Sequence, residues 1–170
     1  MVKQNLQKAL NIQIQKEFYS AYLYLSMSAY CSDKNLNGFA HWFYTQYQEE
    51  QTHGHKLYNY LLQRGVKIEL EAIEKPKTNF ESPLSVMRES LAHEQHMTDS
   101  FNKLSDIAID NRDHATYNFL QWFVNEQVEE ESTVRDIISK IERVGENSNA
   151  LYMLDRELEN RTFVDETATV

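Results

Sequence analysis

Four long stretches of this chain place their apolar side chains at alternating steps of four and three residues. That spacing puts the repeating positions on one face of an α-helix, and such a face is stable only when other helices cover it. The whole chain of 170 residues contains only four Gly and two Pro, so few residues interrupt long helices. We therefore predict an all-α fold, a four-helix bundle.

The four apolar stretches and the turn residues between them predict the bounds of the helices. We expect long helices at about 5–32, 37–64, 83–110 and 113–144, then a short fifth helix at 148–159. The joins between the first and second helices, and between the third and fourth, are so short that each pair must be antiparallel. The tail, 162–170, is expected to be loose and polar.

The segment between the second and third helices is long enough to run the full height of the bundle. Residues 65–82 include Pro76, which ends any helix there. A segment of that length spans up to ~60 Å when extended, and the second helix is only ~40 Å long. We expect parallel second and third helices, joined by one long crossover, in a single domain, 1–170. A flexible linker between two domains is the alternative.

Composition argues against several classes of function. The net charge of −9 disfavours nucleic acids and anionic membranes as partners. The chain has one cysteine, Cys31, so it cannot form an intrachain disulfide or a cysteine-rich metal site. The first residues lack the apolar core of a signal peptide, and no apolar run approaches the ~20 residues of a membrane span. We expect a cytoplasmic protein with neither nucleic-acid nor membrane partners.

Each long helix carries one acid in its apolar stripe near mid-length: Glu17, Glu50, Glu94 or Glu130. His53 follows Glu50 by three residues, so both side chains can reach one metal ion from the same helix face. Four buried carboxylates without cations would cost several kcal/mol each or take up protons. Counting ~1.5 Å per residue along the helices places a lower metal at Glu17 and His53, and an upper one at Glu94 and Glu130. Glu50 can bridge them.

The donor set indicates which metals fit. Carboxylate oxygens with one imidazole suit iron or manganese, and structural zinc would need thiolates. The fourth helix has Gln127 three residues before Glu130, where a second Glu-x-x-His could stand. The upper site therefore lacks a histidine and should hold its metal more weakly. A weak site is better suited to passing iron onward than to keeping a permanent cofactor.

With these residues the chain resembles the ferritins, specifically the non-haem ferritins of prokaryotes. The resemblance runs from about residue 5 to 158, through KEFYSAYLYLSMSAYC, QEEQTHGHKLYNYLLQRG, HEQ and NFLQWFVNEQVEEE in the right order. Ferritin-like di-iron proteins combine Glu-x-x-His with carboxylates from other helices. The resemblance implies a ferroxidase centre with one iron held by Glu17, Glu50 and His53, and the other by Glu50, Glu94 and Glu130, with Gln127 beside them.

The resemblance also implies roles for residues around this centre. Tyr24 and Trp122 match aromatic residues that can donate electrons, although both could simply be packed aromatic side chains. A third iron site would be formed by Glu49, Glu126 and Glu129, which the helical count places at a similar height on the adjoining face. The family further implies a homo-oligomeric cage of about 24 copies with ferric mineral inside.

Two family features do not transfer. Bacterioferritins bind haem through a methionine at the position of Gln51, so we expect no haem. Animal ferritins carry pore carboxylates where this chain has Tyr117 and Leu120, which leaves the iron entry route open. The five remaining histidines are expected at the surface: His41, His55, His93, His96 and His114.

These features indicate an iron-storage ferritin that oxidises Fe(II) with O2 or H2O2. The main alternative is a di-iron or di-manganese oxidase or peroxidase of the same superfamily that keeps its metals and stores no iron. A cytokine-like or adaptor bundle would need an apolar core, which the four acids contradict. The mini-ferritins that coat DNA place their metal site between subunits and lack the fifth helix.

Overall fold

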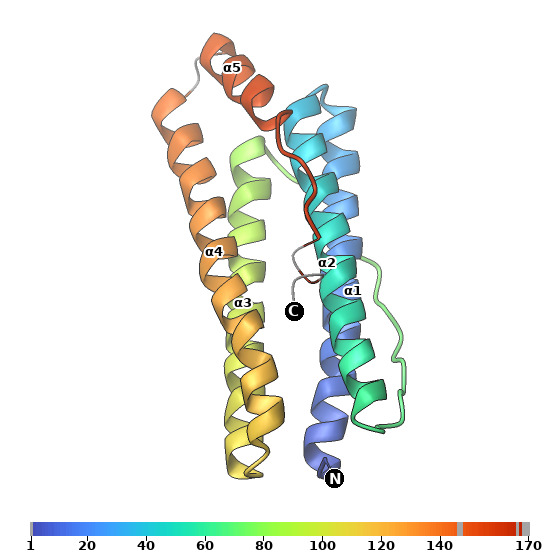
Figure 1. Ribbon diagram of the computed structural model, residues 1–170. Coiled ribbons are helices and arrows are strands. Elements are labelled where there is room, and N and C mark those ends of the chain that lie inside the picture. The colour runs from blue at the N-terminus through green and yellow to red at the C-terminus, as the bar shows by residue number, and fades with distance from the viewer. Residues whose placement is uncertain (1, 146–147, 166, 168–170) are drawn as a thin grey trace.

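The computed structural model describes residues 2–145, 148–165 and 167, which form five α-helices and no strand (Figure 1). The helices are α1 (Gln4–Asp33), α2 (Asn37–Gln63), α3 (Pro83–Asp110), α4 (His114–Val144) and α5 (Ser148–Leu158). Each helix starts and ends within one residue of its expected position. The all-α fold with a short fifth helix is confirmed. Within the described residues, no helix combines the length and the apolar character that crossing a membrane requires.

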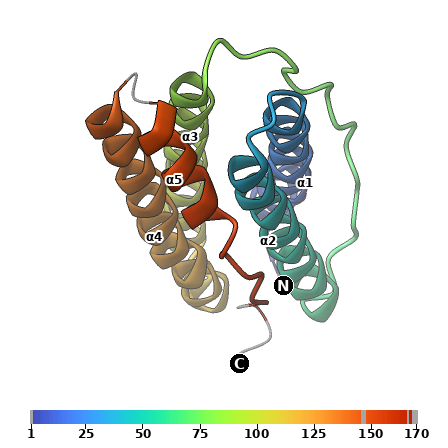
Figure 2. The same ribbon diagram turned by 90° about the horizontal axis from the view of Figure 1, so that it is seen from above.

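Two antiparallel hairpins make up the bundle, because α1 packs along α2 and α3 packs along α4. The chain between α2 and α3 runs along the outside of the first hairpin, from one end of the bundle to the other (Figures 1 and 2). Side chains of α1 hold this crossover. Asn11 bonds to the backbone of Lys67 and Glu69, and Ser26 donates to the carbonyl of Lys77 over 2.7 Å. The parallel arrangement of α2 and α3 is therefore confirmed.

Helix ends follow the capping chemistry of the sequence. Ser82 accepts a hydrogen bond from the backbone N–H of Ser85, whose hydroxyl in turn accepts from the N–H of Ser82, and Pro83 begins α3. Asp113 accepts from the N–H of Thr116 at the start of α4. Local side chains therefore fix where α3 and α4 begin.

The apolar core is divided into two clusters. The cluster near the N-terminal end of α1 includes Leu6, Leu10, Ile14, Leu57, Leu61, Phe101, Leu120 and Phe123. The cluster at the other end, beneath α5, includes Tyr24, Met27, Phe39, Phe43, Met87, Val134, Leu154 and Leu158. Between them lie the buried acids Glu17, Glu50, Glu94 and Glu130. A polar layer therefore interrupts the core at mid-height, and the apolar clusters keep it enclosed.

One buried carboxylate docks α5 onto α2. Oδ1 of Asp155 accepts hydrogen bonds from the backbone N–H groups of Gly38 (2.9 Å) and Phe39 (3.0 Å). These groups lie at the N-terminus of α2, where N–H groups lack helical partners and negative charge is favoured. α5 also contacts α4, so it closes one end of the bundle.

Candidate metal centre

Glu17 from α1 and the pair Glu50 and His53 from α2 meet in the polar layer. Nδ1 of His53 lies 3.4 Å from Oε2 of Glu50 and 3.8 Å from Oε2 of Glu17. One possible ligand atom from each residue lies within 4.8 Å of the others, and all three side chains are buried. This group could hold one metal ion with two carboxylates and one imidazole, the donor set that the sequence predicts for the lower site. Iron binding by these residues stays a prediction.

The upper pair, Glu94 on α3 and Glu130 on α4, is also buried. Gln127 donates from Nε2 to Oε2 of Glu94 over 3.0 Å, and Gln46 donates to Oε2 of Glu130 over 2.9 Å. Within the part of the chain that the structure describes, these carboxylates belong to no three-residue group as close as that of Glu17. Each of these two acids is therefore held by a neutral amide, and their binding of a metal ion stays a prediction.

Glutamine amides hold three of the four acids, and sequence reasoning placed only Gln127 of these three beside the acids. Gln13 on α1 is buried and donates from Nε2 to Oε1 of Glu17 over 2.7 Å. Its own oxygen accepts from the Ser100 hydroxyl on α3 over 2.6 Å, and that hydroxyl accepts from Nζ of Lys16 over 2.7 Å. The i,i+4 spacing of Gln13 and Glu17 was the available signal. This chain of hydrogen bonds fixes the orientation of the Glu17 carboxylate.

Glu50 is the acid without such an amide. Its Oε2 atom is buried and accepts no hydrogen bond from the described residues. A buried oxygen of this kind is costly unless a proton or a cation approaches it. Because Oε2 also lies only 3.4 Å from Nδ1 of His53, the residues present fit a metal ion that both would bind.

The acids of the polar layer hold protons more tightly than exposed carboxyls do. Burial, and then the charge of Glu50, raises the pKa of Glu17 well above its usual range. Burial, and then the charge of Glu94, does the same to the pKa of Glu50. Burial raises the pKa of Glu94, and burial with the charge of Glu94 raises the pKa of Glu130 to about 7. A cation that binds must therefore displace protons.

This protonation predicts that Zn(II) binding to the metal-free protein releases more protons at pH 6 than at pH 8. Below its pKa of about 7 the Glu130 carboxyl carries a proton that a metal must displace, and above that pH it does not. We expect a difference of roughly one proton per chain. Isothermal titration calorimetry in buffers of different ionisation enthalpy measures it. Glu130→Gln should remove the difference, and an equal release at both pH values in the wild type would contradict the assignment.

Tyr24 and Trp122 both contact the acids or the histidine. Tyr24 is fully buried, and its hydroxyl donates to Oε1 of Glu94. Burial, and then the charge of Glu94, raises the pKa of that hydroxyl. The Trp122 ring lies edge-on to the ring of His53, with centroids 5.4 Å apart. Both aromatic side chains are therefore packed directly against predicted ligands.

One of the other histidines is less exposed than the rest. His93 is half-buried, its Nε2 lies 2.7 Å from the Ser20 hydroxyl, and its ring lies edge-on to Tyr24 at 6.0 Å. The other four are exposed, as expected. His93 precedes Glu94 on α3, so it lies beside the centre on the side of Tyr24.

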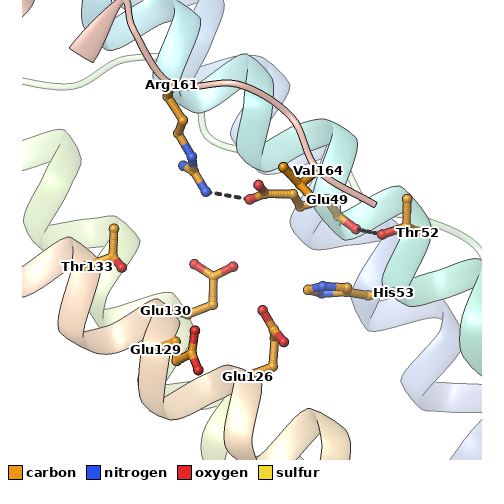
Figure 3. Close-up of a pocket in the computed structure, with 9 residues that line it drawn as sticks. All are labelled: Glu49, Thr52, His53, Glu126, Glu129, Glu130, Thr133, Arg161 and Val164. Carbon is orange, nitrogen blue, oxygen red and sulfur yellow. Dashed lines mark hydrogen bonds and ion pairs between the residues drawn. The ribbon is translucent and has the colours of Figure 1, made fainter. Parts of the chain in front are cut away.

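The three acids of the predicted third iron site line a cavity of about 120 Å³ beside the centre (Figure 3). Glu49 and His53 reach it from α2, and Glu126, Glu129 and Glu130 from α4. The other lining residues are Thr52, Thr133, Arg161 and Val164. The cavity has room for several water-sized ligands. The structure therefore brings these acids together on the face adjoining the centre, although their binding of iron stays a prediction.

The segment that follows α5 runs along the surface of the bundle. Arg161 and Val164 line the acidic cavity (Figure 3). Asp165 lies beside α2, where it lines a second pocket with Thr52 and Lys56. The residues of the predicted tail that precede position 166 are exposed, as expected of a polar segment, but their path follows α2. Residues 166 and 168–170 of the predicted tail lie outside the described part.

A bundle with one long crossover, with buried carboxylates from all four long helices and one histidine, defines the ferritin-like class of proteins. A family model for the ferritin-like domain matches residues 7–144. The chain is 45% identical over 166 residues to the bacterial non-heme ferritin of Staphylococcus aureus (strain USA300), covering 98% of this chain and 100% of the relative. It is 43% identical to that of Staphylococcus haemolyticus (strain JCSC1435), with the same coverage. The chain belongs to the ferritin family.

Solved structures agree with this assignment. An open pore ferritin from the hyperthermophilic archaeon Archaeoglobus fulgidus superposes with a TM-score of 0.94 at 42% identity, covering 95% of this chain and 100% of that one. A closed form of the same ferritin, engineered by site-directed mutagenesis, gives a TM-score of 0.95 at 42% identity, covering 96% and 100%. The resemblance drawn from the sequence motifs is therefore confirmed.

Proposed function

We propose that this protein is an iron-storage ferritin that oxidises Fe(II) at the centre in its polar layer and keeps the ferric product as mineral inside a cage. The observation that carries the proposal is the convergence of four buried acids and His53, with an oxygen of Glu50 left without a hydrogen bond from the described residues. Membership of the ferritin family and the relatives named non-heme ferritin support the same function. We propose a homo-oligomeric cage of about 24 copies.

The residues divide the work of oxidation between them. Two ferrous ions are the substrate. One binds at Glu17, Glu50 and His53, and the other at Glu50, Glu94 and Glu130. Each ion gives up one electron, and O2 takes both electrons with two protons and leaves as H2O2. With H2O2 as the oxidant, two electrons and two protons give two water molecules. Carboxylates favour the more highly charged ferric product, so the acids lower the free energy of the oxidised state.

The asymmetry of the centre favours release of the product. The pair Glu94 and Glu130 has Gln127 where a second histidine could stand, so it binds iron more weakly than the site with His53. Glu49, Glu126 and Glu129 offer a third position in the adjoining cavity. Tyr24 and Trp122, in contact with Glu94 and His53, are placed to supply further electrons when O2 is reduced beyond H2O2.

An anaerobic titration of the metal-free protein with Fe(II), followed by O2, tests this function. Absorbance and particle mass are recorded together. We expect two or three ions to bind per chain and to be oxidised rapidly, and the same large particle then to take up far more iron than that ratio. Tight retention of two metals in a small oligomer without further loading would instead support the di-metal oxidase or peroxidase alternative.

A further inference from the structure

The segment after α5 brings one positive charge into the acidic cavity. Nη2 of Arg161 forms an ion pair with Oε2 of Glu49 over 2.5 Å, and Figure 3 shows the guanidinium reaching in from the tail side. Its side chain is 22% exposed and that of Glu49 is 17% exposed, so water screens the pair only partly. The charge of Arg161 also opposes the rise in the pKa of Glu130. The guanidinium therefore interacts electrostatically with acids from both helices that line the cavity, α2 and α4.

Contacts with α2 hold Arg161 in this place. Its guanidinium lies over the ring of Trp42, 4.7 Å from the centroid, in a cation–π contact. Its backbone carbonyl lies 2.7 Å from Nε2 of His41, which donates a hydrogen bond when it carries the proton. Asp155 anchors α5 just before this segment. These contacts distinguish Arg161 from an arginine that moves freely in solvent.

The guanidinium is not fully satisfied in this position. Its Nη1 atom is buried and donates no hydrogen bond to the described residues. Burial of a donor without a partner costs free energy, because the donor has lost its bond to water. The ion pair with Glu49 therefore holds the guanidinium in the cavity. The unsatisfied Nη1 atom destabilises this position, so a cation that competes for Glu49 displaces the guanidinium more easily.

We propose that Arg161 is the built-in counter-ion of the pocket formed by Glu49, Glu126 and Glu129, and that a metal ion must displace its guanidinium from Glu49 to bind there. The inference rests on the proposed third iron site. A divalent cation at Glu49 would meet the positive charge of Arg161 at short range, where like charges repel strongly in a partly buried pocket. Arg161 therefore lowers the affinity of the third position and lets the centre at Glu50 fill first.

Arg161→Ala and Arg156→Ala form a matched pair for the test. Both remove one positive charge near the end of the chain, but Arg156 lies on α5, pairs with Glu159 just after that helix and does not line this cavity. Assembled, metal-free protein is titrated with Zn(II) by calorimetry. We expect Arg161→Ala to raise the affinity for the third ion about tenfold, and to change the affinity for the first two ions much less, because its ion pair is with Glu49. Arg156→Ala should bind all three ions as the wild type does.

Further variants separate the failure of this inference from the failure of the third site. Glu126→Gln should abolish binding of the third ion in any background. If it does, but Arg161→Ala leaves that affinity unchanged or lowers it, the site stands and the counter-ion inference is wrong. If wild type and all variants bind only two ions, the third site is wrong and the inference with it, while the two-ion centre stands. Arg161→Gln, which keeps a polar side chain, should match Arg161→Ala, and light scattering checks assembly.

Discussion

Replacing Glu50 by Gln is expected to lower the initial rate of Fe(II) oxidation by about 100-fold or more. Glu50 is the acid shared between the proposed iron positions, and its Oε2 atom faces Nδ1 of His53 at 3.4 Å. The amide of Gln keeps the shape but removes the negative charge that both ions need. Stopped-flow absorbance in air-saturated buffer gives the rate. A variant as fast as the wild type would show that Glu50 holds no iron during oxidation.

The same substitution is expected to make the metal-free protein more stable at pH 8. Burial raises the pKa of Glu50 above the usual 4.5, so the folded state keeps a proton that the unfolded state has released. The contribution of Glu50 to the free energy of unfolding is therefore most favourable below pH 4.5. This contribution is lost as the pH rises toward the pKa of Glu50 in the folded state. A neutral amide at this position would carry no such penalty. Thermal melting midpoints of variant and wild type should lie closest at low pH and diverge toward pH 8.

Glu74→Gln provides a matched control for both measurements. Glu74 lies exposed on the crossover, away from the polar layer, and the substitution makes the same change of charge and shape. We expect the oxidation rate and the melting midpoint of this variant to equal those of the wild type. If Glu50→Gln leaves the pH dependence of melting unchanged, the Glu50 carboxyl is better hydrated than its burial indicates. A loss of activity together with a gain in stability is the expected signature of a functional buried charge.

The spacing of apolar residues was enough to predict the helices and the height of the acids. A helix advances by a fixed rise per residue, so positions of acids on different stripes can be compared by counting. The crossover of 65–82 was predictable from its length and Pro76 for the same reason. Those quantities depend on backbone geometry alone, and no knowledge of side-chain conformation is needed.

The contacts inside the centre were less predictable. Counting residues placed Glu94 and Glu130 in an upper site, apart from Glu17 and His53, but it could not show that Gln127 donates to Glu94 and Gln46 to Glu130. Which amide donates to which carboxylate depends on side-chain rotamers, which the residue count does not give. The link from Gln13 to Ser100 joins residues 87 positions apart, so no local pattern reveals it.

The position of Arg161 shows a different limit. Residues 161–165 have no apolar period, and polar segments near a chain end are commonly loose. Their path is set instead by the docking of α5 through Asp155 and by the Trp42 ring beneath Arg161. Both contacts join segments that are far apart in the sequence. A tail of this kind can be placed only after the bundle that it packs on is known.

Replacing Gly38 by Ala is expected to destabilise the protein by more than ~3 kcal/mol or to release α5. Within a helix, Gly→Ala normally stabilises by roughly 0.5–1 kcal/mol, so the sign here is reversed. A Cβ atom on Gly38 would lie 1.6 Å from the carbonyl oxygen of Asp155 and 2.5 Å from its carbonyl carbon. These are backbone atoms, which cannot rotate away. Thermal melting, with limited proteolysis at α5, measures the effect.

Gly65→Ala separates a steric clash from ordinary backbone strain. Gly65 has a φ of +65°, but an added Cβ would meet nothing within 4 Å. Its cost should be about 1 kcal/mol, from the positive φ alone. Melting midpoints should therefore rank wild type above Gly65→Ala, and Gly65→Ala above Gly38→Ala. The reverse order would contradict the close approach of α5 to α2. If Gly38→Ala frees α5, the contact of Arg161 with Glu49 should also weaken, because the docked helix leads the tail to the acidic cavity.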